Sequence, residues 1–167
     1  MSAERLLAAL ERRGLKLAVA ESLTGGLLSG AITEVAGASK VFLGSITAYQ
    51  SILKQQLLGV SGQLLENQGA VDPEVVAQMA TGLRRKLSKS CGLDEAQVIG
   101  IATTGVAGPD EQDGKPVGTV FIGISGVEEV GEVVYAHSFA GNRSEIRHQT
   151  VNAAITHLLE HFDNLGG

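Results

Sequence analysis

The chain has 167 residues, of which 44% are apolar, and its formal net charge is −5. The length fits one domain of roughly 100–200 residues, and the apolar share excludes global disorder, so we expect a single domain over residues 1–167. The negative net charge and the lack of a basic run argue against an extended nucleic-acid surface but not against a small anionic ligand. A single cysteine, the absence of an apolar stretch near ~20 residues and an N-terminus unlike a signal peptide predict a soluble, cytoplasmic protein without a disulfide or membrane span.

The first half of the chain alternates helical and extended patterns. Residues 3–13 predict an amphipathic helix, and residues 17–20 (LAVA) predict a short buried strand. Thr24-Gly25-Gly26 then opens a helix that begins at Leu27 and that Gly37 can close. Residues 41–50 predict a second strand, residues 51–58 a short helix carrying Lys54, and residues 64–65 a further helical turn before Gly69.

The second half predicts a long helix, three strands and a final helix. Asp72 as N-cap and Pro73 in the first helical position start a helix of about four turns. Residues 97–104 (QVIGIATT) are almost all apolar, which is typical of a strand covered on both faces, and residues 106–116 are irregular. Strands over residues 117–125 and 132–139 are joined by a short link and form an antiparallel hairpin, and Asn142 caps the last helix. We therefore expect a three-layer α/β/α domain with a mixed sheet of about five strands.

Two of the expected strands end in turns rich in hydroxyl groups and glycine, at residues 21–26 and 103–108. Ligands bind at the carboxyl ends of strands in open α/β sheets, so Ser22, Thr24, Thr103 and Thr104 are expected to converge on one crevice. Unpaired N–H groups at the start of the following helix could hold an anion, or an oxyanion beside a serine nucleophile. The same residues also fit a plain helix start, with Thr24 as its cap and the glycines allowing tight packing.

A serine nucleophile needs a base, and the chain offers histidine or lysine. His137 falls in a strand and His148, His157 and His161 in the last helix, where the i, i+4 spacing of the last two is also that of a metal-ligand pair. No third ligand accompanies them, so we interpret them as exposed helix residues and expect no metal. Lys54, with Ile52, Leu53 and Leu57 around it, could lose its proton in apolar surroundings, although an ordinary surface lysine fits as well.

Several short motifs in one fixed order resemble a known family. They are ESLTGG at residues 21–26, Tyr49 and Lys54 leading into LLGV, GAV at 69–71, TGVAGPD at 104–110, KPVGTV at 115–120 and GNR at 141–143. Each is weak alone, but together, from about Leu6 to Phe162, they resemble the CinA C-terminal domain, the nicotinamide-nucleotide amidohydrolase family. Members often carry a further N-terminal domain, and this chain looks like the stand-alone form.

The resemblance implies hydrolysis of the carboxamide of nicotinamide mononucleotide to nicotinic acid mononucleotide and ammonia, without a cofactor. It implies a catalytic set of Ser22 as nucleophile, Lys54 as base and Tyr49, in a homo-oligomer of two or more chains. Arg143, with the threonine and glycine turns, would bind the substrate and its phosphate. The substrate-binding residues expected on this basis are Thr24, Gly25, Gly26, Thr103, Thr104, Gly105, Ala107, Gly108 and Arg143.

One segment departs from the family pattern. The family usually has Tyr-Ser-Asn-Glu-Ala-Lys, whereas this chain has Tyr49-Gln50-Ser51-Ile52-Leu53-Lys54. The lysine is kept, but the Asn and Glu are replaced by Ser51 and Ile52. A non-catalytic nucleotide-binding or regulatory domain is therefore the alternative, although the retained Ser22 and Lys54 favour an enzyme.

Overall fold

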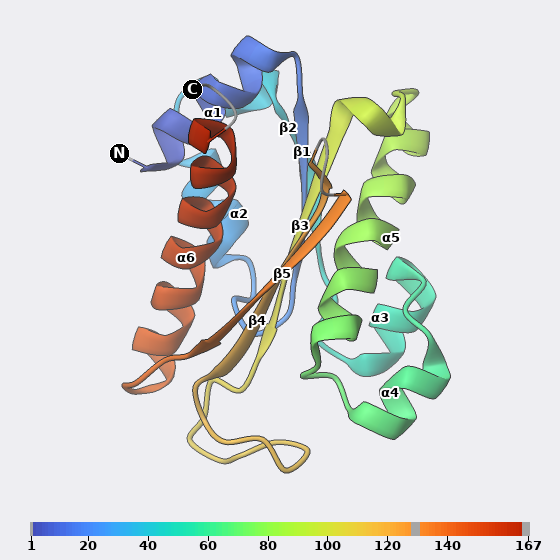
Figure 1. Cartoon of the computed structure of the whole chain (residues 1–167), viewed down its shortest axis with the longest axis vertical. Helices are drawn as coiled ribbons and strands as arrows, with labels where there is room; N and C mark the ends of the chain where they lie inside the picture. Colours follow the sequence, from blue (N-terminus) through green and yellow to red (C-terminus); the bar gives the residue numbers. More distant parts are fainter. Residues whose placement is uncertain (1, 128–130, 165–167) are drawn as a thin grey trace.

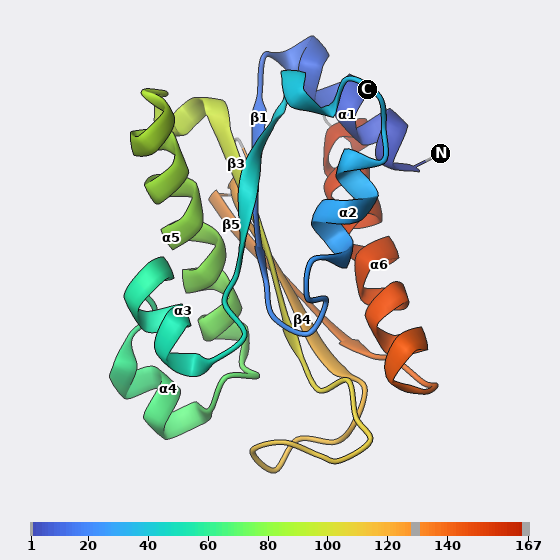
Figure 2. The ribbon, with the colours of Figure 1, turned by 180° about the vertical axis from the view of Figure 1, so that it is seen from behind.

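A computed structural model describes residues 2–127 and 131–164 and shows a single sheet between two layers of helices (Figures 1 and 2). The five strands are β1 (Lys16–Glu21), β2 (Phe42–Thr47), β3 (Val98–Gly105), β4 (Thr119–Val127) and β5 (Gly131–Ser138). The α-helices are α1 (Ser2–Arg13), α2 (Leu27–Thr33), α3 (Ser51–Leu58), α4 (Gly62–Gln68), α5 (Pro73–Cys91) and α6 (Arg143–Asn164). Short 3₁₀ turns, Ala38–Lys40 and Glu95–Gln97, precede β2 and β3.

The sheet is mixed, as the sequence predicts. Its strand order is β2-β1-β3-β4-β5, in which β1 pairs in parallel with β2 and β3, while β3–β4 and β4–β5 are antiparallel. The carboxyl ends of β1, β2 and β3 therefore lie at one edge of the sheet, and the irregular residues 106–118 extend beyond that edge (Figure 1).

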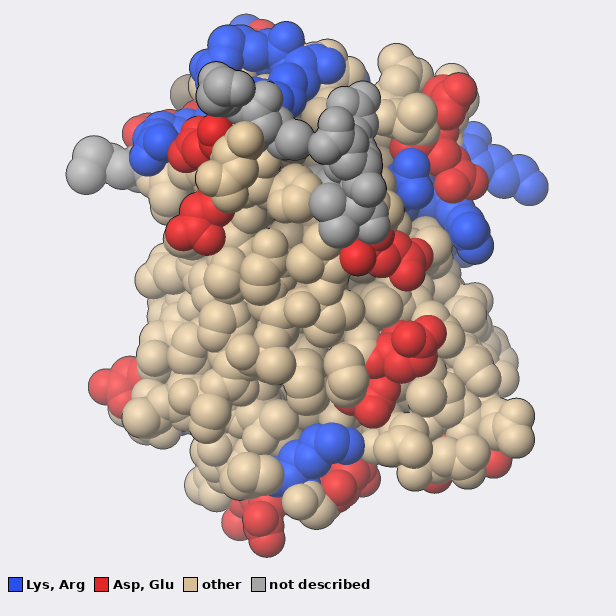
Figure 3. All heavy atoms as spheres, in the orientation of Figure 1, with Lys and Arg blue, Asp and Glu red and all other residues tan. Residues whose placement is uncertain are grey.

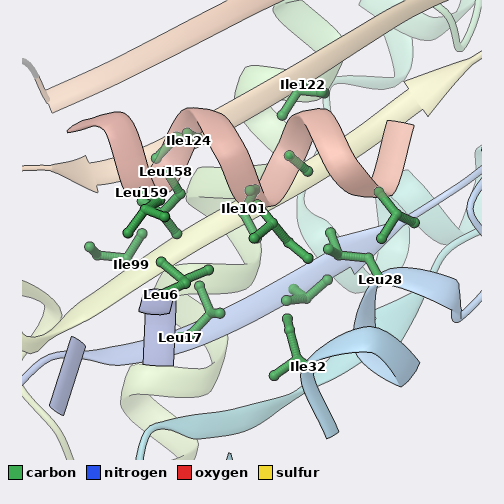
Figure 4. Close-up of a cluster of buried hydrophobic side chains, with 14 of the residues drawn as sticks. Leu6, Leu17, Leu28, Ile32, Ile99, Ile101, Ile122, Ile124, Leu158 and Leu159 are labelled. Atoms are coloured by element: carbon green, nitrogen blue, oxygen red, sulfur yellow. The ribbon is translucent and has the colours of Figure 1, made fainter. Parts of the chain in front are cut away.

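The two faces of the sheet differ in the size of their side chains. Leu17 and Val19 of β1 join the larger core, which α1, α2 and α6 cover, whereas Ala18 and Ala20 face the other way, toward the core of α5. Figure 4 shows the larger cluster, with isoleucines of β3 and β4 packed against Leu6, Leu28, Ile32, Leu158 and Leu159. On the other face α5 lies so close that a Cβ added at Gly100 would be 2.3 Å from the carbonyl oxygen of Ala80.

The predicted start of α2 at Leu27 and the two predicted caps Asp72 and Asn142 are confirmed, whereas the alternative role of Thr24 as the cap of α2 is wrong. Asp72 accepts from the N–H groups of Glu74 and Val75, and Asn142 Oδ1 accepts from the N–H of Glu145. Thr24, in contrast, caps nothing: α2 begins after Gly26, whose backbone is left-handed with φ +97°. The Thr24 hydroxyl instead shares a buried 2.8 Å hydrogen bond with that of Thr103.

Charged side chains are unevenly spread over the surface. In Figure 3, lysine and arginine gather at the end of the molecule where α1 lies, and the face formed by α6 and β5 carries few charges. None of the described helices combines the length and apolar composition that a membrane crossing requires.

Candidate active site

Ser22 and Lys54 meet in the structure although 31 residues separate them in the chain. The Lys54 ammonium donates a 3.1 Å hydrogen bond to Ser22 Oγ, so the predicted juxtaposition is confirmed. It also donates to the carbonyl oxygens of Ala48, at 2.7 Å, and Tyr49, at 3.2 Å. Three acceptors thus surround one lysine nitrogen, two of them backbone carbonyls that cannot change their protonation.

The parallel strands bring these residues together. Ser22 follows β1 directly, and its N–H donates to the carbonyl of Thr103 on β3. Ala48 follows β2, and its N–H donates to the carbonyl of Glu21 at the end of β1. The helix α3 then turns back so that Lys54, on its inner face, reaches the end of β1.

Lys54 is completely buried, with no exposed side-chain area. This burial lowers the pKa of its ammonium from 10.5 to about 8, because the charged form loses its hydration. The predicted source of burial is wrong: Ile52, Leu53 and Leu57 are 54%, 36% and 38% exposed and lie on the outer side of α3. The spacing of positions 52, 53 and 57 could not show which side of a two-turn helix faces the sheet.

The start of α2 is already occupied by a carboxylate of the same chain. Buried Glu21 accepts from the N–H groups of Gly26, Leu28 and Ser29 at 2.9–3.0 Å, and from the Ser29 hydroxyl. The Gly25 N–H donates to the carbonyl of Ser22. An oxyanion site was expected near Thr24 to Gly26 or at the Thr104 turn. In the first of these places the N–H groups of Gly25 and Gly26 are not free, because the Ser22 carbonyl accepts from Gly25 and the Glu21 carboxylate accepts from Gly26.

Other backbone N–H groups near the serine remain available. Within residues 2–127 and 131–164, the N–H groups of Leu23, Ala107 and Gly108 have no hydrogen-bond acceptor. All three residues line the cavity into which Ser22 opens. The N–H of the residue after a nucleophile, joined by one from a second loop, is a common oxyanion-binding arrangement.

This cavity has a volume of about 250 Å³, slightly below the ~300–1,000 Å³ of typical ligand pockets. The expected site residues that line it are Ser22, Tyr49, Lys54, Thr104, Gly105, Ala107, Gly108 and Arg143. Thr24, Gly25, Gly26 and Thr103 do not line it. Asp110 and Gln112, which the sequence analysis did not single out, line it as well.

Arg143 connects three parts of this cavity. From the first residue of α6, it donates to the carbonyl of Gly108 at 2.6 Å and to the hydroxyl of Tyr49 at 3.0 Å. A guanidinium has five N–H groups, so further ones remain for a ligand. The residue is exposed as well as hydrogen-bonded, which fits a side chain at the mouth of a cavity.

Two supporting contacts hold the walls of the site. Arg147, one turn along α6 from Arg143, donates to the carbonyls of Leu23 and Thr24 at 2.8 and 2.9 Å and so fixes the turn after Ser22. Buried Thr104 donates to the carbonyl of Ala70 at 2.7 Å, which ties the end of β3 to the loop between α4 and α5. Sequence reasoning missed Arg147 because its partners are backbone carbonyls more than 120 residues away.

The histidines are placed differently from the prediction that they are exposed helix residues. Only His148 is exposed; His157 and His161 are half-buried. His157 stacks on Tyr135, and its Nε2 lies 2.8 Å from Nε2 of His137, so these rings join α6 to β5. Over the part of the chain that the structure describes, no group of three or more His, Cys, Asp or Glu side chains could hold a metal ion.

The fold and the site together define a three-layer α/β/α domain with a buried serine–lysine pair at the carboxyl edge of a mixed sheet. The family model described as "CinA C-terminal domain" matches residues 1–162, and the chain belongs to this family. A CinA-like protein from Frankia casuarinae is 44% identical over 150 residues, which is 90% of this chain and 32% of that protein. The chain spans about a third of the length of the curated relatives it matches.

Solved structures of similar length share the fold. A CinA superfamily protein from Klebsiella pneumoniae superposes with a TM-score of 0.85 at 29% identity, covering 98% of this chain and 96% of that one. A competence/damage inducible protein from Agrobacterium tumefaciens gives a TM-score of 0.84 at 32% identity, over 96% of this chain and 93% of that one. These matches show the family and the three-layer architecture.

Proposed function

We propose that the domain is an amidohydrolase that converts nicotinamide mononucleotide and water to nicotinic acid mononucleotide and ammonia in pyridine-nucleotide salvage. The observation that carries the proposal is the 3.1 Å contact between a fully buried lysine and a serine that opens into a polar cavity. A buried amine next to a serine hydroxyl is a recognised way to activate a nucleophile.

The surroundings of Lys54 suit a base that gains and loses one proton. When its amine is neutral, its two N–H groups donate to the carbonyls of Ala48 and Tyr49, and its lone pair faces Ser22 Oγ. The serine hydroxyl then donates to the amine instead of accepting from it. A pKa of about 8 gives a useful neutral fraction near pH 7, which an ordinary lysine with a pKa of 10.5 would lack.

The reaction follows two half-steps. Ser22 Oγ attacks the carboxamide carbon while its proton passes to Lys54, and the oxyanion is received by the N–H groups of Leu23 and of Ala107 or Gly108. The tetrahedral intermediate collapses as Lys54 returns the proton to the departing nitrogen, leaving an ester on Ser22 and free ammonia. Water, deprotonated by Lys54, then attacks the ester and releases the carboxylic acid and the serine hydroxyl.

Arg143 is the natural partner for the phosphate of the mononucleotide. It stands at the first residue of a long helix, where the helix dipole also favours an anion, and it keeps unused N–H groups at the cavity mouth. Gly105, Ala107 and Gly108 line the wall between this arginine and Ser22. A small nucleotide would then lie with its carboxamide at the serine and its phosphate at the mouth.

The decisive experiment incubates the purified chain with nicotinamide mononucleotide in the presence of EDTA and measures ammonia and nicotinic acid mononucleotide. The mechanism draws its nucleophile and base from Ser22 and Lys54, so both products should accumulate in equal amounts despite chelation. Binding of the nucleotide without any product would favour the alternative, a nucleotide-binding domain. Activity that requires an added divalent ion would exclude the serine–lysine mechanism.

A further inference from the structure

We propose that the carboxylate of Asp110 binds the positively charged pyridinium ring of nicotinamide mononucleotide and makes the cavity selective for a charged ring. This role deepens the proposed function and rests on it, because it concerns the same substrate in the same cavity. Asp110 would determine specificity without taking part in the proton transfer between Ser22 and Lys54.

The charged side chains of the cavity match the charges of this substrate. Among the described residues, two with cationic side chains line the cavity, Lys54 and Arg143, and one with an acidic side chain, Asp110. Lys54 must be neutral to act as the base, so the reacting site contains one cation and one anion. The mononucleotide also carries both signs, because its phosphate is negative and its ring nitrogen, bonded to the ribose, is permanently positive. With the phosphate at Arg143, the carboxylate of Asp110 is the group left to face the ring.

The carboxylate of Asp110 is not neutralised within the protein. Over residues 2–127 and 131–164 it accepts no hydrogen bond and forms no ion pair. In particular it does not pair with Arg143, whose guanidinium donates to Gly108 and Tyr49 instead. Its charge therefore remains available to a ligand. A cavity excludes part of the water that screens exposed charges, so the attraction to a bound cation is stronger there than on an open surface.

The loop that carries Asp110 is fixed on both sides of that residue. On one side the Gly108 carbonyl accepts from Arg143 at 2.6 Å. On the other side the backbones of Gln112 and Lys115 donate to each other at 3.2 and 2.9 Å, and the Lys115 ammonium donates to the carbonyl of the last residue of α4 at 2.9 Å. The loop backbone is thus held in place before the substrate arrives, and less conformational freedom is lost on binding.

The other side chains of the cavity are poorer partners for a cation. The pyridinium nitrogen has no hydrogen to donate, so a protein can recognise its charge through an anion or through an aromatic face. Among the described residues, Tyr49 is the aromatic one that lines the cavity. Its hydroxyl accepts from the guanidinium of Arg143, and this positive charge opposes a second cation at the same ring. Asp110 offers a full negative charge instead.

Reduced nicotinamide mononucleotide provides a probe of this charge recognition. Its dihydropyridine ring keeps the carboxamide, the ribose and the phosphate of the oxidised form but has no positive charge. Asp110 should therefore favour the oxidised form over the reduced one, whereas contacts to the carboxamide and to the phosphate should be the same for both.

Isothermal titration calorimetry of both mononucleotides in a Ser22→Ala background, which cannot turn them over, tests the proposal. The oxidised form should bind roughly tenfold more tightly than the reduced form. Asp110→Asn keeps the shape of the side chain and removes its charge, so it should weaken binding of the oxidised form roughly tenfold and that of the reduced form less than about twofold. Asp110→Glu restores the charge and should retain the preference.

Glu111→Gln is the matched control. Glu111 is the next residue of the same loop and is also exposed, but it does not line the cavity. Its substitution removes the same charge and should leave both affinities unchanged, and circular dichroism checks that all variants remain folded. An equal loss of affinity in Glu111→Gln and Asp110→Asn would trace the effect to the net charge of the protein and overturn the proposal.

Two further results separate this role from the proposed reaction. If the unchanged chain forms product and Asp110→Asn binds the oxidised form as tightly as before, or loses both forms equally, the role of Asp110 is overturned and the reaction stands. If the unchanged chain forms no product and the Ser22→Ala protein binds neither mononucleotide, the proposed reaction is overturned and the role of Asp110 with it.

Discussion

In the proposed mechanism Ser22 and Lys54 exchange one proton, and this transfer requires both residues. The serine hydroxyl is a weak nucleophile until the amine 3.1 Å away accepts its proton. The other two hydrogen-bond partners of that amine are the backbone carbonyls of Ala48 and Tyr49, which exchange no proton with it. Ser22→Ala and Lys54→Ala should therefore each abolish turnover while nucleotide binding persists. The double variant should lose little more than either single one, because residues that act as a unit give non-additive losses.

The same pair predicts a pH dependence, measured as kcat/KM. Only neutral Lys54 can accept the serine proton, and burial lowers its pKa to about 8, so the rate should rise with pH and level off above that value. A kcat/KM that stays constant between pH 6 and about 9 would contradict this role of Lys54. Independent, additive losses of activity in the two alanine variants would contradict the pairing of Ser22 with Lys54.

Arg143 offers a separate test of the substrate. Arg143→Ala should raise the KM for nicotinamide mononucleotide by about tenfold to a hundredfold, the loss of one charge-assisted contact to phosphate, with little effect on folding. Arg12→Ala, on the exposed side of α1, is the control and should change neither the KM nor the folding of the protein. An unchanged KM in Arg143→Ala would remove this side chain from the substrate site.

At the scale of elements, the position of Lys54 depends on how closely α3 lies against α5. A Cβ added at Gly82 of α5 would be 1.6 Å from the carbonyl oxygen of Leu58, the last residue of α3. Glycine at position 82 is thus the reason that the C-terminal end of α3 can touch α5. Any side chain there must push the helix that carries the lysine.

Gly82→Ala should destabilise the protein by about 1–3 kcal/mol, the usual penalty of overpacking, and reduce turnover by displacing Lys54. The matched control is Gly30→Ala in α2, where a Cβ would have no neighbour within 4 Å. It should instead stabilise by about 0.5–1 kcal/mol, since alanine favours helix over glycine. Urea unfolding measures both variants, and equal stabilities would show that the close contact is unimportant.

For the whole molecule, the sequence predicts the elements better than their contacts. The alternation of apolar patterns predicts the three layers and the mixed sheet, because burial periodicity is a local property of the chain. The pairing of Ser22 with Lys54 was expected only through the family resemblance. It depends on three parallel strand ends meeting at one edge, which no local pattern encodes.

The errors made from sequence share one physical cause. Glu21 fills the start of α2, Thr24 bonds to Thr103, and the exposed side of α3 is the apolar one. In each case the local sequence pattern is compatible with two arrangements of the side chains, and tertiary packing selects one of them. An argument from hydrophobic periodicity assigns the apolar side of a helix to the core. For α3 that assignment is wrong, because its apolar side is the exposed one.

Burying Lys54 also affects the stability of the whole domain. Its pKa is about 8 when folded and 10.5 in its ordinary state, so below pH 8 the folded protein must hold a buried charge, which costs about 3 kcal/mol. Between these two values the unfolded chain binds more protons than the folded one, so stability rises with pH across that window. The unfavourable contribution is thus present at neutral pH and is relieved toward pH 10.5.

Lys54→Met removes this titration and keeps most of the side-chain volume. The stability of the unchanged protein relative to Lys54→Met should therefore increase by about 2 kcal/mol between pH 7 and pH 9.5, because all other titrating groups are common to both. Urea unfolding of the two proteins at both pH values measures this difference, and it cancels the pH-independent loss of hydrogen bonds to Ala48 and Tyr49. A difference that stays constant from pH 7 to pH 9.5 would show that the folded lysine keeps its ordinary pKa, and the proposed base would then be protonated at neutral pH.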